Sequence, residues 1–159
     1  MRWGIESGEL DPTLPYALDV AKAAVAEEVP VALLYAIAWH ESIAGEVAGL
    51  WTAATVLSDD GGHGLCQLTS SWPDDWEIPF SNASFACSQF IVPAAQYWYQ
   101  RVEGAFALVK CIAATYNAGL GNAVAGHSIG NVDAYTTDGY GAAVTAIFAS
   151  IIETGKPSP

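Results

Sequence analysis

Residues 30–42 read "PVALLYAIAWHES", an apolar stretch that ends in a glutamate and a serine. The stretch contains no other acidic residue and no lysine or arginine. At helical spacing Leu33, Ile37 and Glu41 lie on one face, because positions i, i+4 and i+8 line up. Leu34 falls on the same face. The spacing therefore predicts that Glu41 points into the core or a cleft, where a carboxylate is costly to bury.

The rest of the chain also shows mostly helical patterns. Pro30 is suited to open the helix of the 30–42 stretch, which is expected to end near Ser42. The helix before it has Thr13 as a candidate N-cap and Pro15 in its first turn. This preceding helix is expected near 14–28. Apolar residues at helical spacing predict further helices near 84–102, 105–117 and 138–153.

Two stretches between the helices have other patterns. The pair Asp59-Asp60 and several glycines precede "HGLCQLTS" (63–70), which is compatible with a short strand after a turn. "SSWPDDWEIPFSNAS" (70–84) contains two prolines and predicts a long surface loop. The predicted fold is therefore mostly α, within the α+β class: a helical domain with a small β element around residues 58–70.

The size and charge of the chain limit its functional class. With 159 residues and no repeat or low-complexity linker, we expect a single domain over 1–159 with its core over about 15–152. Its net charge of −12 disfavours binding to nucleic acid or to anionic membranes. No apolar run approaches the roughly 20 residues that span a bilayer, and the N-terminus lacks the pattern of a secretory signal. We therefore expect neither a signal peptide nor membrane insertion.

The cysteines predict no metal centre. Cys66, Cys87 and Cys111 are odd in number and widely spaced, which fits neither a disulfide framework nor a zinc site. We expect buried free thiols, with one disulfide and one free thiol as the alternative. No metal or other cofactor is expected.

Three short motifs occur in a fixed order: "HES" (40–42), "GLCQL" (64–68) and "ATYNAG" (114–119). This series resembles the motifs of the lysozyme-like lytic transglycosylases and goose-type lysozymes. "HESIAG" (40–45) and "DAYTTDGYGAAVTAIFAS" (133–150) are similar to segments of the goose-type branch. The resemblance covers about residues 15–152 and implies a lysozyme-like fold with a cleft beside the β element.

The resemblance implies that Glu41 is the general acid of a glycosidase. Such an acid must stay protonated near neutral pH until it reaches the leaving oxygen. An apolar surrounding raises the pKa of a carboxyl, and so does the negative end of a helix dipole. Both effects are expected at Glu41. A surface glutamate on a fraying last turn is the structural alternative.

A second carboxylate is available in "SDDGGHGLCQ" (58–67). An inverting glycosidase needs a base that activates a water molecule opposite the acid. The goose-type pattern of an aspartate followed by glycines favours Asp60 for this role, and Asp59 fits with a one-residue deletion. A solvated acidic turn remains the structural alternative, because Asp and Gly are ordinary turn residues.

One departure from the goose-type pattern keeps a second mechanism open. Those enzymes commonly carry an aspartate where this chain has Thr69, and Cys66 replaces the usual methionine. A transglycosylase needs no catalytic water, since the substrate's own hydroxyl attacks and leaves an anhydro-sugar end. Hydrolysis is expected, with transglycosylation as the alternative.

The resemblance also assigns residues that hold the sugar chain. Gln67 resembles the glutamine of the cleft. Tyr116 and Asn117 match a pair that supports the acid and the substrate's acetamido group, and Tyr140 matches a tyrosine near the cleft. The substrate-binding set is then Ser42, His63, Gln67, Tyr116, Asn117 and Tyr140. Core packing is the alternative for Tyr140, and simple helix capping is the alternative for the Tyr116–Asn117 pair. Gln67 has a solvent-facing strand position as its alternative, and His63 a position in a turn.

The implied substrate is the β-1,4-linked glycan strand of peptidoglycan, with a chitin-like polymer as the weaker alternative. The acidic balance would repel an anionic wall, which fits either a salt-rich setting or delivery by other means, such as mounting on a phage particle. Because no signal peptide is expected, a phage endolysin or a virion-associated lysin is the expected context. We then expect the protein in the host cytoplasm before release, or in the virion. A protein of another class, an inactive glycan-binding or structural lysozyme-like module, is kept as the alternative.

Overall fold

The apolar 30–42 stretch forms the central helix of the protein. The computed structural model describes residues 3–158, and α2 (Val31–Ala38) lies in the middle of it. Every residue from 32 to 38 is buried, so this helix has no solvent face. The prediction of one buried face is therefore too narrow, because helices pack on more than one side of α2. Its neighbours include α1 (Ala17–Ala26) and α8 (Tyr140–Thr154).

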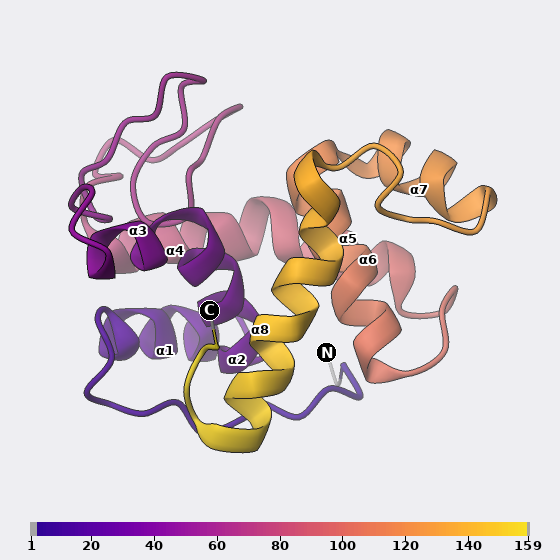
Figure 1. The fold of residues 1–159 in the computed structure, drawn as a ribbon, viewed down its shortest axis with the longest axis horizontal. Coiled ribbons are helices and arrows are strands. Elements are labelled where there is room, and N and C mark those ends of the chain that lie inside the picture. The colour runs from indigo at the N-terminus through magenta and orange to yellow at the C-terminus, as the bar shows by residue number, and fades with distance from the viewer. Residues whose placement is uncertain (1–2, 159) are drawn as a thin grey trace.

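Helices account for most of the described chain, as predicted (Figure 1). In order they are α1, α2, a π-helical turn η1 (Trp39–Ile43), α3 (Ala44–Val47), α4 (Pro79–Ala86), a π-helical turn η2 (Cys87–Ile91), α5 (Val92–Trp98), α6 (Ala105–Ala118), α7 (Leu120–Ser128), a 3-10 turn η3 (Thr137–Gly139) and α8. In Figure 1, α8 runs through the centre, where it packs against α2 and α6, while α4 lies above α1.

The predicted helix boundaries are corrected at several places. Helix α1 begins at Ala17, after Tyr16, whose φ of 58° is left-handed and stops a helix from starting earlier. Thr13 is no cap of this helix, since its hydroxyl donates to Asp11 over 2.7 Å. Helix α4 already starts at Pro79, inside the predicted surface loop. Helix α7 was not predicted, and it begins directly after Gly119.

The predicted β element is reduced to two isolated antiparallel bridges, Leu57–His63 and His63–Leu68. The buried amide of Asn82 holds this region instead of a strand ladder. Its Oδ1 accepts a hydrogen bond from the Cys66 backbone over 2.8 Å, and its Nδ2 donates to the carbonyls of His63 and Trp76. A side chain thus satisfies backbone groups that a sheet would pair.

A hydrophobic core cluster draws on residues from Trp3 to Ile151. All three cysteines lie in it as free thiols, and burial raises the pKa of each of them. Of the helices within residues 3–158, none combines the length and the apolar character needed to cross a membrane.

Candidate functional site

A pocket of about 350 Å³ opens where the helix of Glu41 meets the 48–78 loop region. Acidic, amide and apolar side chains share its wall: Glu41, Trp51, Val56, Leu57, Ser58, Asp59 and Gln67. A larger hollow of about 740 Å³ is lined by residues 6–12 and 152–155, and its lining does not include Glu41. The smaller pocket is the candidate site, because it joins a perturbed carboxyl to polar groups and apolar surface.

Glu41 is partly buried and lies on the π-helical turn η1, which is continuous with α2 and α3. Burial raises the pKa of Glu41 to about 7, and the negative charge of Asp60 pushes it the same way. A hydrogen bond of 2.5 Å from the Tyr140 hydroxyl to Glu41 Oε1 opposes both effects. The helix continues to Val47 instead of ending near Ser42, so the predicted dipole effect of a helix end does not apply.

The π-helical turn is held from the side by two side chains. The hydroxyl of Ser42 donates to the Leu65 carbonyl over 2.7 Å, and Trp51 Nε1 donates to the Ser42 carbonyl over 2.9 Å. Ser42 is buried and is not part of the pocket lining. Its hydrogen bond instead joins the Glu41 helix to the 64–68 segment. Wide turns of this kind are uncommon and occur often at functional sites.

Gln67 lines the pocket with a fixed side chain. Its amide donates to the Gly64 carbonyl over 2.7 Å, and its own backbone is left-handed, with φ of 47°. Gly62 makes this arrangement possible: a Cβ there would lie 2.5 Å from Gln67 Oε1 and 2.7 Å from Ser58 Oγ. The glycine-rich segment therefore sets the position of the glutamine as well as the turn.

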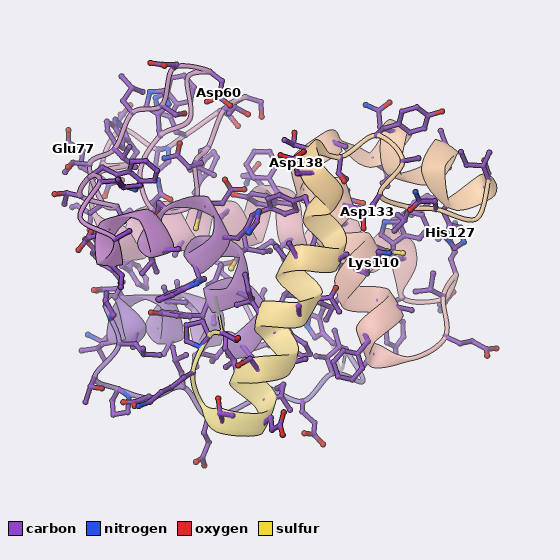
Figure 2. All side chains as sticks on the ribbon, in the orientation of Figure 1. Asp60, Glu77, Lys110, His127, Asp133 and Asp138 are labelled. Atoms are coloured by element: carbon purple, nitrogen blue, oxygen red, sulfur yellow. The ribbon has the colours of Figure 1, made fainter. Side chains whose placement is uncertain are left out.

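A second carboxylate should line the pocket and should act on Glu41 by its charge, and the structure divides these two properties between Asp59 and Asp60. Asp59 lines the pocket with Glu41. Asp60 raises the pKa of Glu41 by its charge, while hydrogen bonds from the Ser58 hydroxyl and the Gly62 backbone lower the pKa of Asp60 itself. Figure 2 shows Asp60 on the loop that rises above α3. Both aspartates are exposed and remain candidates.

His63 belongs to an aromatic cluster rather than to the lining of this pocket. Its ring stacks on Trp72 with centroids 3.7 Å apart and meets the edge of Trp76 at 5.0 Å. Its Nδ1 lies 2.7 Å from the Gly61 carbonyl. Trp72 keeps 43% of its surface exposed, so the cluster presents an indole to solvent.

Tyr116 and Asn117 support the site from α6. The Tyr116 hydroxyl donates to the Cys66 carbonyl over 2.5 Å, which holds the 64–68 segment. Asn117 Oδ1 accepts a hydrogen bond from the Thr137 backbone over 2.9 Å, at the turn before Tyr140. The residue that bonds Glu41 is Tyr140, so the support expected from the Tyr116–Asn117 pair is indirect.

Two residues near Glu41 were not predicted to take part. Trp51 lines the pocket, and its ring is packed so closely on Gly45 that a Cβ at Gly45 would lie 2.1 Å from it. His40 also lies near Glu41, and its ring meets the edge of Tyr140 with centroids 4.7 Å apart. In the sequence the Gly45–Trp51 pair appears only as a glycine with a tryptophan six positions later, which is a weak signal.

A partly buried acid with a raised pKa, a nearby ionised carboxylate and an aromatic wall can protonate a leaving oxygen on a bound polymer. Among the described residues 3–158, no group of three or more His, Cys, Asp or Glu side chains is placed to hold a metal ion. Comparison with protein-family models finds no match to this chain, and comparison with curated proteins finds none either.

Proposed function

We propose that this protein is a glycosidase that cleaves the β-1,4 bond between N-acetylmuramic acid and N-acetylglucosamine in peptidoglycan. The observation that carries the proposal is the partly buried Glu41 carboxyl at the wall of an open pocket, bonded by the Tyr140 hydroxyl, where burial raises its pKa to about 7. A carboxyl of this kind is protonated at mildly acidic pH and can act as a general acid. The order of the motifs, similar to goose-type lysozymes and lytic transglycosylases, supports the same activity and a lysozyme-like fold.

In the proposed reaction Glu41 gives its proton to the glycosidic oxygen as the bond breaks. Tyr140 orients the Glu41 carboxyl through its hydrogen bond and stabilises the carboxylate that forms. A water molecule, activated by Asp60 or Asp59, adds to the sugar carbon and gives a reducing end. Gln67 and Trp51 line the pocket where the neighbouring sugar rings would lie.

Transglycosylation is the second candidate, and two hydrogen bonds to Asp60 favour it. Asp60 Oδ1 already accepts hydrogen bonds from Ser58 and from the Gly62 backbone, which reduces its capacity to take a proton from water. Thr69 also stands where goose-type lysozymes commonly have an aspartate. In this mechanism Glu41 protonates the leaving oxygen, and the resulting carboxylate takes the proton of the substrate's own attacking hydroxyl. The fragment with the new muramic end then closes as an anhydro-sugar.

The net charge of −12 bears on how the protein would reach its substrate. Anionic cell walls repel such a protein at low salt, and added salt screens the repulsion over about 10 Å at 0.1 M. Delivery as a phage endolysin or on a phage particle would bring it to the wall without electrostatic steering. Activity should therefore tolerate added salt.

Zymography on purified peptidoglycan, repeated over a range of pH and salt, tests the proposed class. We expect a cleared zone at mildly acidic pH. A folded protein that gives no clearing under any condition would instead be a glycan-binding or structural module. Co-sedimentation with insoluble peptidoglycan then measures whether that module binds.

A further inference from the structure

Asp133 lies outside the pocket, at the start of the helix that carries Tyr140. We infer that Asp133 is a positioning residue for Glu41: it fixes the N-terminus of α8 and thereby the hydrogen bond from Tyr140 to the acid. This inference rests on the proposed function only in taking Glu41 as the acid. Asp133 acts through α8, because its own contacts are with the helix end and with α6.

The carboxylate of Asp133 caps α8. Its Oδ1 accepts a hydrogen bond from the Gly141 backbone over 2.8 Å, and its Oδ2 accepts one from the Ala142 backbone over 3.0 Å. The first N–H groups of a helix have no partner within it, and a negative charge there is favourable. The residue at the usual capping position is Gly139, which has no side chain to cap with. A more distant carboxylate therefore takes its place.

Gly141 and Lys110 hold the cap in register. A Cβ on Gly141 would lie 2.5 Å from Asp133 Oδ1 and 2.8 Å from the Lys110 carbonyl, so only glycine permits this approach. Lys110 Nζ lies 3.3 Å from Asp133 Oδ2, and the Thr136 hydroxyl donates to Oδ1 over 3.1 Å. Figure 2 shows Asp133 and Lys110 beside the upper half of α8. These contacts tie the start of α8 to α6.

The capped end of α8 is where the acid is held. Tyr140 is the first residue of α8, it is buried, and its hydroxyl meets Glu41 Oε1 at 2.5 Å. A hydrogen bond this short tolerates little displacement of the helix end. On the other side of the turn, Asn117 holds the Thr137 backbone. Asp133 and Asn117 thus fix the helix start and the turn before it.

The direction in which the pKa of Glu41 shifts when Asp133 is removed distinguishes a positioning role from a direct effect of its charge. The titratable groups that act on Glu41 are Tyr140, by its hydrogen bond, and Asp60, by its charge, while Tyr116 and Cys66 feel the charge of Glu41. Removing a negative charge nearby would lower the pKa of Glu41. Losing the Tyr140 hydrogen bond raises it, because that bond favours the carboxylate. The inference requires an upward shift.

NMR titration of 13C-labelled glutamate carboxyls measures this shift without any need for cleavage, and Glu41→Gln assigns the signal. We expect the pKa of Glu41 to rise in Asp133→Ala, in the same direction as in Tyr140→Phe. The double variant Asp133→Ala/Tyr140→Phe should shift no further than Tyr140→Phe alone. Asp138→Asn is the matched control, since it removes an exposed carboxylate beside the same helix end and should leave the titration unchanged.

An unchanged or lowered pKa in Asp133→Ala would overturn the inference and leave Asp133 as an ordinary helix cap. Additive shifts in the double variant would also overturn it. If Asp133→Ala does not fold, Asp133→Asn keeps one acceptor oxygen and is judged by the same direction of shift. A protein that shows these shifts but clears no peptidoglycan would refute the proposed function and leave the inference standing.

Discussion

The hydroxyl of Tyr140 lies 2.5 Å from Glu41 Oε1 and donates a hydrogen bond across 99 positions of sequence. Burial holds the pKa of Tyr140 well above its usual range, so the phenol stays a donor at any working pH. The bond favours the charged form of Glu41, while burial of Glu41 and the charge of Asp60 favour the protonated form. The pKa of about 7 results from this opposition.

Tyr140→Phe should shift the pH dependence of activity. The phenyl ring keeps the buried volume but loses the hydrogen bond, so the pKa of Glu41 rises and activity persists to higher pH. The measurement is the alkaline limb of the pH–rate profile. Tyr35→Phe is the control, because its buried hydroxyl donates to the Pro15 carbonyl and should leave the limb in place. A limb that moves to lower pH would contradict the account.

The raised pKa of Glu41 should also appear in the free energy of unfolding. Between pH 4.5 and about 7 the unfolded carboxyl ionises while the folded one keeps its proton, so stability falls as pH rises through this window. The loss levels off above about pH 7, at up to about 3 kcal/mol for a change from 4.5 to about 7.

Urea unfolding at a series of pH values checks this prediction. In Glu41→Gln the extra fall over the window should disappear, leaving the variant more stable than the wild type at neutral pH. Glu153→Gln removes an exposed carboxylate at the end of α8 and should keep the slope of the wild type. Identical slopes in the wild type and Glu41→Gln would show that Glu41 titrates normally.

Asp60→Asn and Asp59→Asn distinguish the two mechanisms and the two aspartates. If Asp60 activates water, Asp60→Asn should lower the rate by about 10²–10⁴-fold, with Asp59→Asn much less affected. Mass spectrometry of the products from the unmutated protein should show reducing ends. Anhydro ends, one water lighter, together with a small effect of both substitutions, would make the protein a transglycosylase.

The pattern of apolar residues was enough to predict most helices but not the way they end. Helix α6 and helix α8 lie close to their expected ranges, because long periodic runs report burial directly. The π-helical turn at Glu41 was not predictable, because the contacts that hold it come from packing. The Ser42 hydroxyl donates to the Leu65 carbonyl, and the Trp51 indole donates to the Ser42 carbonyl. The prediction of a β element was too large for a similar reason. The Asn82 amide makes hydrogen bonds to backbone groups that neighbouring strands would otherwise pair.

The site was predictable in part. The motifs name Glu41, Gln67 and Tyr140, and the structure brings them together, but the contact between Glu41 and Tyr140 depends on how α8 crosses α2. Asp133 carried no local signal, because it caps a helix that starts seven positions later, at Tyr140. Long-range caps and close glycine contacts follow from packing, which a single sequence does not display.

Trp51→Ala should weaken substrate binding more than it slows the chemical step. The indole is fixed by its bond to the Ser42 carbonyl and presents a surface to the pocket on which a sugar ring can stack. We expect KM to rise about tenfold, equivalent to about 1.4 kcal/mol. The fall in kcat should be smaller, and it arises because the turn that carries Glu41 loses the bond from Trp51 to the Ser42 carbonyl. Steady-state kinetics on soluble glycan fragments measures both.

Gly45→Ala gives the same test from the other side of the ring. A Cβ at Gly45 would lie 2.1 Å from the Trp51 ring and must displace it, so KM should rise as in Trp51→Ala. Leu50→Ala, at an exposed neighbour of Trp51, is the control and should keep the KM of the unmutated protein. An unchanged KM in both test variants would remove Trp51 from the substrate site.

The release of soluble glycan fragments from purified peptidoglycan, compared between the unmutated protein and Glu41→Gln, tests the central claim most directly. The amide has nearly the same shape as the carboxyl but has no acidic proton for the leaving oxygen, so release should fall by at least about 10²-fold. Circular dichroism of the variant should be unchanged. Equal release by the two proteins would show that Glu41 is not the acid, and the account of this site would be wrong.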